Sequence, residues 1–456
     1  MSTPDSARLS VFQLVVYSAP SLATSVAALP MLLFVPAFYS DNLGIPLAAV
    51  GGAIAASRLL DVVTDLGIGT LSDRLRLPLG RRKSWMALGL PLFLLSLWKV
   101  FVPGEEASAG YLLGWSAGLY LGFTMIDLPH KAWGAELSTD YDERSRITSW
   151  REALSTFGQV LLLAVLVVLA MRGVDDAGQQ LRSIAVAIVV ALPVLMLACL
   201  GFVEEREPEI VRHEERSLRA GLALVVRNPA FVRMVLCVLF FVSGVAIQGT
   251  LHRFVLADVM GDEGRFPLMI LCENLATLAA VPIWLWVSLR MGKPQALMGA
   301  ALWLALWSLP LVFLRGGDTT ALMVLVVLRG SSFASILFLA NSIAADVIDV
   351  DTLESGEQRS GLFFAVWGMV IKLSLALGVI LGTGLPAAAG YEPSAELVDP
   401  GISARLMAIY GAVPALLMAI GALCLRGFPI TRERQAEVRA RIDAATTRRS
   451  GAERSR

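Results

Sequence analysis

Long apolar stretches recur along the whole chain, and no other feature constrains its fold so strongly. A helix that crosses a bilayer needs about 20 mostly apolar residues. Soluble domains are charged at about 25% of positions, whereas this chain of 456 residues is 17% charged and 56% hydrophobic. The sequence therefore predicts an all-α membrane protein with twelve transmembrane helices and excludes an ordinary soluble enzyme. The expected spans are 12–39, 44–71, 84–102, 111–135, 152–171, 182–203, 229–254, 267–289, 294–314, 319–347, 361–387 and 403–425.

Basic residues in the short loops indicate how the chain is oriented. Cytoplasmic loops are enriched in Lys and Arg. The loops after the second, fourth and sixth expected spans are rich in arginine, whereas loop 103–110 on the opposite side has no basic residue. Both termini are therefore expected in the cytoplasm of a multi-pass plasma membrane protein, and the arginine-rich, lysine-poor usage favours a bacterial inner membrane. The apolar run from Val11 to Phe38 is too long for the core of a cleavable signal peptide.

The longest loop divides the chain into two halves of similar organisation. We expect an N-terminal six-helix half over 1–203, a central cytoplasmic loop over 204–228, a C-terminal six-helix half over 229–425 and a basic cytoplasmic tail over 426–456. The second span leaves the membrane through a Gly- and Arg-rich loop, and the eighth span leaves through Arg290-Met-Gly-Lys293. This repetition predicts a pseudo-twofold axis along the membrane normal, with a site near the midplane between the halves.

The second span carries three charged residues at helical spacing. Arg58, Asp61 and Asp65 follow one another at i, i+3 and i+4, so they share one helix face, and Thr64 lies beside them. An ionisable group inside a span costs at least ~2.5–3.5 kcal/mol. Two carboxylates one turn apart repel each other unless they hold a cation or share a proton. We therefore predict a cation site here, with an Arg–Asp pair that serves only helix packing as the alternative.

A third aspartate is expected at the same depth. Asp127 lies about 16 residues into the fourth span, against about 17 and 21 residues for Asp61 and Asp65 in a span of the same direction. At about 1.5 Å per residue these depths agree within a turn or so. Asp127 can therefore join the same site, although a simple pair with His130 or Lys131 is the alternative.

The second half offers fewer charged candidates within its spans. Lys372 lies deep in the apolar eleventh span, where it must snorkel, deprotonate or meet a carboxylate. Trp367, five residues earlier, is placed to stack on a ligand or to pack in the core. Glu273 and Asn274 in the eighth span and Arg329 in the tenth are further candidates, with an interhelical pair within the second half as the alternative.

Two charged segments at the cytoplasmic side suggest a gate. The loop after the second span contains Gly69, Asp73, Arg74 and Arg81, and we expect Asp73 to pair with an arginine or with the N-terminus of a neighbouring helix. Plain positive-inside topology is the alternative for these arginines. The acidic run that includes Asp346 and Asp349 either faces the basic loops or is solvated.

Other classes of function lack a sequence signature. The 38 basic and 38 acidic residues cancel, so no global field attracts nucleic acid. The four cysteines lie singly in apolar runs and indicate neither a disulfide framework nor a metal site. We find no nucleophile–base constellation and no phosphate loop. The protein is therefore not expected to be an enzyme, to need a cofactor or to bind nucleic acid, and we expect a monomer.

The charged motifs resemble those of one transporter family. The Gly–Asp–Arg…Gly–Arg–Arg–Lys loop over 69–83 is similar to the signature of the major facilitator superfamily. The remaining motifs resemble the glycoside–pentoside–hexuronide:cation symporters, which include melibiose permease, and the resemblance covers most of the chain. They are Arg58…Asp61…Thr64-Asp65…Gly69, Asp127-Leu-Pro129…Gly134-Ala-Glu136, Asp142-Glu-Arg144-Ser-Arg146…Arg151, Ala345-Asp346-Val-Ile-Asp349 and Gly361-Leu-Phe363 with Lys372.

This resemblance implies roles for individual residues. Asp61 and Asp65 would bind the coupling cation, with Thr64 beside them. Asp127 and Arg151 would line the substrate site, while Arg58 and Lys372 would join the surrounding charge network.

The chain also departs from the family pattern. Lys131 takes the place of a substrate-stacking tryptophan, and Ser25 takes the place of a sugar-binding carboxylate in the first span, where Tyr17 is another polar group. Leu66 replaces a frequent proline. These departures leave cation coupling in place and open the question of the solute.

The sequence thus favours a secondary active transporter that couples sodium or proton symport to uptake of a small solute, sugar or glycoside-like, by alternating access. A cation-coupled transporter of a non-sugar amphiphile such as a lysolipid is one alternative. A membrane sensor that keeps this fold without transporting is another. Its expected partners are the solute, the coupling cation and the lipid bilayer.

Overall fold

The computed structural model of the protein describes residues 8–75, 78–104, 107–172, 176–205, 227–355, 360–391, 400–438 and 440–441. Within these residues all regular secondary structure is helical, which confirms the expected all-α class. The expected central loop lies almost wholly outside the described residues, as does the end of the basic tail.

The first group of helices occupies the expected spans, but the helix at the fifth span begins at Tyr141, eleven residues before the expected start at 152. Ser10 begins the first of them with a capping box, in which its hydroxyl accepts from Gln13 N–H and the Gln13 side chain accepts from Ser10 N–H. The helices of this group are α1 (Val11–Leu33), α2 (Val35–Ala37), the π-helix η1 (Phe38–Asn42), α3 (Leu47–Arg74), α4 (Lys83–Phe101), α5 (Ala109–Glu136), α6 (Tyr141–Met171) and α7 (Ala177–Phe202).

The second group repeats this pattern. Asn228 caps its first helix by accepting from Phe231 N–H, and Pro229 occupies the first turn, where its missing N–H has no cost. The helices are α9 (Pro229–Phe254), the π-helix η2 (Val255–Val259), the 3₁₀-helix η3 (Glu263–Arg265), α10 (Phe266–Met291), α11 (Lys293–Ser308), the 3₁₀-helix η4 (Leu309–Phe313), α12 (Thr319–Gly330), α13 (Phe333–Ser355), α14 (Ser360–Ala388) and α15 (Pro400–Cys424).

The span expected over 319–347 is one of those that the structure divides into shorter elements. Residues 319–347 form two helices, α12 and α13, which are separated at Ser331 and Ser332. The Ser331 hydroxyl donates to Leu328 O, and such local bonds compete with the helix ladder. Among the described residues, nine helical segments are long and apolar enough to cross a membrane by length and composition. The helices α3, α5 and α6 occupy the remaining expected spans but are not among these nine.

The chain divides into two compact units. The first comprises Met1–Leu224, Ile348–Val366 and Glu433–Arg456, and the second comprises Val225–Val347 and Trp367–Arg432. The first unit therefore includes the end of α13, the start of α14 and the C-terminal segment, in addition to the six N-terminal spans. The sequence alone did not predict that these three segments belong to the first unit.

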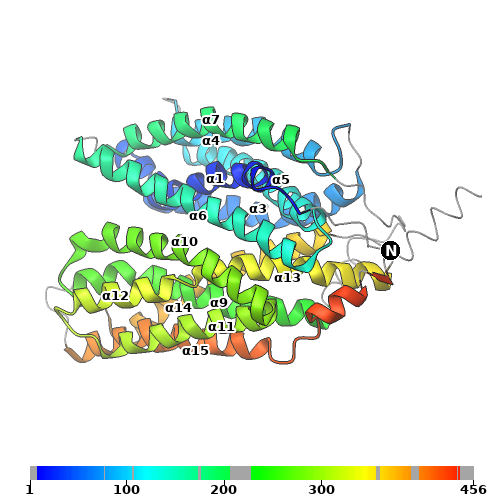
Figure 1. Ribbon diagram of the computed structural model, residues 1–456. Coiled ribbons are helices and arrows are strands. Elements are labelled where there is room, and N and C mark those ends of the chain that lie inside the picture. Colours follow the sequence, from blue (N-terminus) through cyan, green and yellow to red (C-terminus); the bar gives the residue numbers. More distant parts are fainter. Residues whose placement is uncertain are drawn as a thin grey trace, which may run out of the picture. The chain divides into compact units, whose positions relative to one another are not determined.

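Close helix contacts build the first unit. Within it α1 packs against α6 and α7, while α5 packs against α3 and α4 (Figure 1). At Gly158 of α6 an added Cβ would lie 2.3 Å from the carbonyl oxygen of Leu22 on α1, so only glycine permits this approach. The apolar core of the unit includes Leu97, Trp133 and Ile184. This packing holds α3 and α5 side by side, and these two helices carry the three aspartates of interest.

The second unit has a matching internal arrangement. Here α15 packs against α9 and α11, and α10 packs against α12. A π-helix follows the first helix of each unit, η1 after α1 and the short α2, and η2 directly after α9. The start of α4 supplies Arg82 to the end of α5 at Glu136, and the start of α11 supplies Lys293 to Asp346 near the end of α13. These parallels support the internal repeat that the sequence predicts.

Candidate functional site

Asp61 and Asp65 meet at one hydroxyl group of a neighbouring helix. The Oγ1 atom of Thr124 on α5 lies 3.0 Å from Oδ1 of Asp61 and 2.7 Å from Oδ1 of Asp65 on α3. Asp61 is 3% exposed and Asp65 2%. The two carboxylate oxygens are therefore no farther apart than the sum of these two distances, in a setting where water does not screen their repulsion. The predicted sharing of one face by Asp61 and Asp65 is consistent with this geometry.

Thr124 was not a predicted site residue, whereas Thr64 was. The hydroxyl of Thr64 donates to the carbonyl oxygen of Asp61 in its own helix, at 3.0 Å. Thr124 stands three residues before Asp127, on a helix whose register against α3 cannot be read from the sequence. The structure thus supplies a different threonine as the hydroxyl next to both carboxylates.

Arg58, the third charged residue of this helix, stacks on an aromatic ring. Its guanidinium carbon lies 4.1 Å from the centroid of the Tyr120 ring on α5. Such a cation–π contact is worth about 0.5–1 kcal/mol at an exposed site. Arg58 therefore links α3 to α5 one turn away from the Asp61 carboxylate.

A second charged cluster forms around Asp127. Its Oδ2 lies 2.5 Å from Nζ of Lys131 one turn later, and its Oδ1 lies 3.9 Å from Nη1 of Arg151 on α6. Arg151 also lies 3.9 Å from Glu152. The carboxylates of Asp127 and Glu152 and the ammonium of Lys131 are partly exposed, whereas Arg151 is buried. Two acidic and two basic side chains at one partly exposed position can accept hydrogen bonds from a polar solute and donate hydrogen bonds to it.

Two further predicted residues, Tyr17 and Ser25, lie on α1. The Tyr17 hydroxyl donates to the carbonyl oxygen of His130 at 2.8 Å, and its ring lies 5.8 Å from that of Trp133. The Ser25 hydroxyl donates to the carbonyl oxygens of Leu22 and Ser155. Tyr17 is buried and Ser25 half-buried. Both side chains therefore join α1 to its neighbours.

The remaining predicted substrate residues belong to the second unit. Trp367 and Lys372 lie on α14, with Trp367 fully buried and Lys372 half-buried. The pair within the second half that the sequence offered as the alternative for Glu273 and Arg329 is present, because Arg329 Nη2 donates to Glu273 Oε1.

Asp73 is held by an arginine and by the start of a helix, as the loop pattern predicts. Arg82 Nη2 lies 2.7 Å from Oδ1 of Asp73 and 2.7 Å from Oε1 of Glu136. Asp73 also accepts from Gly361 N–H at 2.8 Å and from Leu362 N–H at 2.9 Å, in the first turn of α14. The first N–H groups of a helix lack intrahelical partners and carry partial positive charge, so a carboxylate is favoured there. We call these residues, Asp73, Arg82, Glu136, Gly361 and Leu362, the Asp73 latch.

Two glycines allow the latch to close. A Cβ at Gly69 would lie 2.6 Å from both the Gly361 carbonyl oxygen and the Ala365 Cβ, and a Cβ at Gly361 would lie 2.3 Å from the Gly69 carbonyl oxygen. The backbone of α3 and the start of α14 are therefore in direct contact. This contact explains the glycine at position 69 better than loop topology does.

Other expected gate residues also form pairs. Arg81 reaches Glu136 at 2.8 Å, and Arg144 reaches Asp349 at 2.6 Å within the first unit. Asp346 pairs with Lys293 at 2.5 Å within the second unit, and both side chains are 1% exposed. The side chain of Arg74 lies outside the described part of the chain.

The C-terminal segment covers one of these pairs. Gln435 Nε2 donates to Asp349 Oδ2 at 3.0 Å, and Val438 packs against Val350 and Leu353. Nearby, Arg434 holds the pKa of the exposed Glu437 carboxyl below its ordinary value. The tail therefore reinforces the same region of the first unit that Arg144 and Asp349 join.

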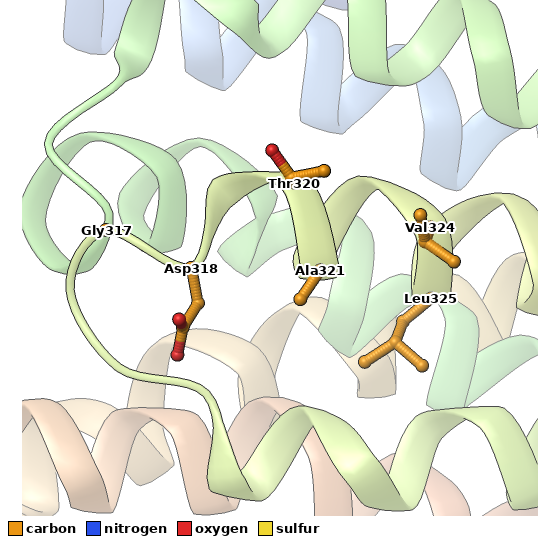
Figure 2. Close-up of a pocket in the computed structure, with 6 residues that line it drawn as sticks. All are labelled: Gly317, Asp318, Thr320, Ala321, Val324 and Leu325. Atoms are coloured by element: carbon orange, nitrogen blue, oxygen red, sulfur yellow. The ribbon is translucent and has the colours of Figure 1, made fainter.

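An open depression in the second unit lies at the start of α12. Figure 2 shows its described lining residues, Gly317, Asp318, Thr320, Ala321, Val324 and Leu325, and its volume is about 550 Å³. Asp318 is the only charged residue among these described lining residues. Arg329 follows Asp318 by eleven residues, which corresponds to about 16 Å along a helix. None of the predicted site residues belongs to this described lining.

Comparison with known proteins gives a consistent family. The family described as MFS/sugar transport protein matches residues 16–432. A symporter of Synechocystis sp. is 24% identical, over 94% of this chain and 96% of its own. The inner membrane symporter YicJ of Escherichia coli is 24% identical, over 92% of each chain. The human sodium-dependent lysophosphatidylcholine symporter 1 is also 24% identical, over 85% of this chain and 77% of its own.

Solved structures show the same fold at lower identity. A variant of the E. coli fucose:proton symporter FucP aligns with a TM-score of 0.65 and 16% identity, over 92% of this chain and 98% of its own. A bacterial homologue of the iron transporter ferroportin aligns with a TM-score of 0.66 and 14% identity, over 92% of this chain and 100% of its own. The fold of this membrane protein is therefore that of major facilitator transporters.

Proposed function

Because the chain belongs to the MFS/sugar transport protein family, we propose that it is a secondary active transporter that couples symport of a small solute to a cation by alternating access. The observation that carries this proposal is the position of Thr124 between the buried carboxylates of Asp61 and Asp65. One hydroxyl has one proton and satisfies one acceptor at a time. A desolvated cation, sodium or a proton, relieves the repulsion of the two carboxylates.

Oxygen ligands favour a hard cation at this position. Asp61, Asp65 and Thr124 offer carboxylate and hydroxyl oxygens, and hard cations are bound by such ligands. A cation that crosses the membrane down its potential supplies about 2.3 kcal/mol per 100 mV, enough for more than tenfold accumulation of a neutral solute. The names of relatives support coupling, since one is a sodium-dependent symporter and a structural neighbour is a proton symporter.

The solute site is assigned to the cluster around Asp127. Asp127, Lys131, Arg151 and Glu152 offer donors and acceptors to sugar hydroxyls, and the family description favours a sugar or glycoside-like solute. Trp367 and Lys372 of the second unit stay predicted substrate residues. A lysolipid is the second candidate, because a lysophosphatidylcholine symporter is among the relatives and the Lys131 ammonium suits a phosphate.

The Asp73 latch would serve as a gate in this cycle. Its charge pairs and helix-terminus contacts are the kind of discrete contact that two alternative packings exchange. Arg144 and Asp349 would add a second pair to the gate. We place the latch and both termini on the cytoplasmic side, because the loops on that side carry the excess of arginine. The setting would be a bacterial inner membrane, with the protein acting as a monomer without a cofactor.

Transport in proteoliposomes tests the proposal. Purified protein is reconstituted, and uptake of a radiolabelled galactoside, a glucuronide and a lysophosphatidylcholine is measured with an inward sodium gradient, an inward proton gradient or neither. We expect gradient-driven accumulation of one solute class, which Asp65→Asn abolishes and the exposed control Asp318→Asn retains. Uptake that only equilibrates the solute, that is the same with and without a gradient and that survives Asp65→Asn, would indicate a uniporter and overturn the coupling.

A further inference from the structure

A buried polar network lies within the second unit, and the proposed function makes no use of it. His252 on α9 contacts residues of three other helices, Glu273 on α10, Arg329 on α12 and Tyr410 on α15. His252 is 4% exposed and Arg329 3%. Ionisable groups at such positions are costly and require a partner or a function.

The contacts of His252 fix the position of its proton. Nη2 of Arg329 lies 3.1 Å from Nε2 of the imidazole, and an arginine can only donate. Nε2 is therefore the unprotonated acceptor, and the ring proton is on Nδ1. Nδ1 lies 2.5 Å from the Tyr410 hydroxyl, so its N–H donates to that oxygen. In this arrangement His252 is a neutral imidazole.

Glu273 is placed to stabilise the protonated form. Its Oε1 accepts from Arg329, and its Oε2 lies 3.6 Å from Nε2 of His252. A proton from solution that binds Nε2 displaces the Arg329 N–H from that nitrogen. The new N–H then donates to Oε2 after a movement of less than about 1 Å, into the ordinary range of hydrogen-bond distances. The carboxylate compensates the second positive charge.

Arg329 has a defined position in both states. Its Nη1 donates to Gln248 Oε1, and the Gln248 amide nitrogen donates to Ser308 Oγ at 3.1 Å and to the Tyr410 carbonyl oxygen at 3.2 Å. Among the described residues, Nε of Arg329 is buried without a hydrogen-bond partner. The guanidinium therefore stays anchored through Gln248 when its contact with His252 is lost.

In the described part of the chain, α14 also packs against this part of α9, through two glycines. The helix α14 meets α9 through Gly378 beside Ser243 and through Gly382 beside Thr250. Along the chain beyond His252, Asp258 accepts from the Tyr391 hydroxyl. Among the described residues, the titratable groups in contact with the His252 ring are Glu273, Arg329 and Tyr410, and Arg253, the next residue along the chain, is exposed.

We propose that His252 is a reversible proton-binding site in the second unit, with Glu273 as its charge partner and Arg329 as the group that protonation displaces. The site belongs to a different unit from Asp61 and Asp65, so it does not depend on the proposed cation coupling. It gives the second half a proton-controlled contact among α9, α10 and α12.

Solid-state NMR of the full-length protein, labelled with ¹⁵N-histidine and reconstituted in lipid bilayers, tests this proposal. The chain has three histidines, and the substitutions His130→Gln and His213→Gln assign their signals. At alkaline pH we expect His252 to be protonated on Nδ1 alone. His130 is an internal control with the opposite tautomer, because its Nε2 lies 2.8 Å from the Tyr17 carbonyl oxygen, which can only accept. As the pH falls from 9, His252 is expected to gain its second proton.

Variants then identify the partner. Glu273→Gln should weaken proton binding at His252 by at least about tenfold, because Arg329 remains while its counter-charge is removed. Tyr410→Phe, which keeps every charge, should shift the neutral tautomer away from Nδ1–H and leave Asp61 and Asp65 untouched. Asp61→Asn should leave the His252 titration unchanged. A single protonation state at every pH at which the wild type stays folded, or an unchanged midpoint in Glu273→Gln, would overturn the proposal.

Discussion

The Thr124 hydroxyl lies 2.7 Å from a carboxylate oxygen of Asp65, on a different helix. The same hydroxyl reaches Asp61 at 3.0 Å. This contact joins α5 to α3 and places three oxygen-bearing side chains around one buried position. It is the geometric basis of the proposed cation site.

Removal of this hydroxyl without loss of volume should weaken cation binding. Thr124→Val deletes one oxygen that contacts both carboxylates, and a hydrogen bond to a charged group is worth about 1.5–3 kcal/mol. We expect an affinity for the coupling cation that is about tenfold to a hundredfold lower, measured by titration of the purified protein. Thr64→Val is the matched control, since that hydroxyl donates to a backbone carbonyl of its own helix. A larger loss of cation affinity in Thr64→Val than in Thr124→Val would assign the cation-binding hydroxyl to Thr64 instead.

Asp127 should act on the solute more than on the cation. Its carboxylate already lies 2.5 Å from the Lys131 ammonium, so a second cation would meet a positive neighbour. We expect Asp127→Asn to lose solute accumulation in proteoliposomes while the purified protein keeps its stabilisation by the coupling cation. Loss of that stabilisation in Asp127→Asn would instead place Asp127 among the cation ligands.

The glycine contact in the Asp73 latch should be sensitive to one methyl group. In Gly69→Ala the new Cβ would collide with the backbone of Gly361, and such overpacking costs about 1–3 kcal/mol. We expect the solute transport rate to fall by about tenfold or more. Gly67→Ala on the same helix has no heavy atom within 4 Å of its Cβ and should transport as the wild type does. Equal rates in the two variants would show that closure of this contact is not needed.

The Arg144–Asp349 pair should show strong coupling in a double-mutant cycle. Both side chains are largely buried, and removal of one partner of a buried pair costs about 3–5 kcal/mol because the other charge is left uncompensated. We expect Arg144→Gln and Asp349→Asn each to lower the melting temperature of the purified protein. In the double variant the melting temperature should fall by less than the sum of the two single decreases. Additive losses would mean that the two side chains act independently.

Much of the architecture follows from the sequence because the bilayer allows so few solutions. An apolar run of about 20 residues in lipid must satisfy its backbone internally, so the runs predict helices. The spacing of Asp61 and Asp65 likewise fixes their common face. The two-helix form of 319–347 was missed, because Ser331 and Ser332 interrupt the helix without Pro or a sharp change in hydropathy.

The partners across helices were harder to predict. Thr124, Glu136 and Glu152 became site or latch residues only through the register of α5 and α6 against their neighbours, and a lone threonine in an apolar run carries no signal of its own. The pairing of Arg82 with Glu136 joins two segments 54 residues apart. By contrast, a pair between Glu273 and Arg329 was one of the two alternatives open from the sequence, because an ionisable group inside a span needs a partner or a function.

The central claim is that Asp61 and Asp65 bind the coupling cation. Its most direct test is a thermal-shift titration of the purified protein with sodium, lithium and potassium at several pH values, with Asp61→Asn and the control Asp318→Asn alongside. A ligand that binds the native state raises the melting temperature by mass action. We predict a rise with sodium, or a pH dependence if the proton is the coupling ion, that Asp61→Asn removes and Asp318→Asn retains. The same rise in wild type and Asp61→Asn would contradict the claim.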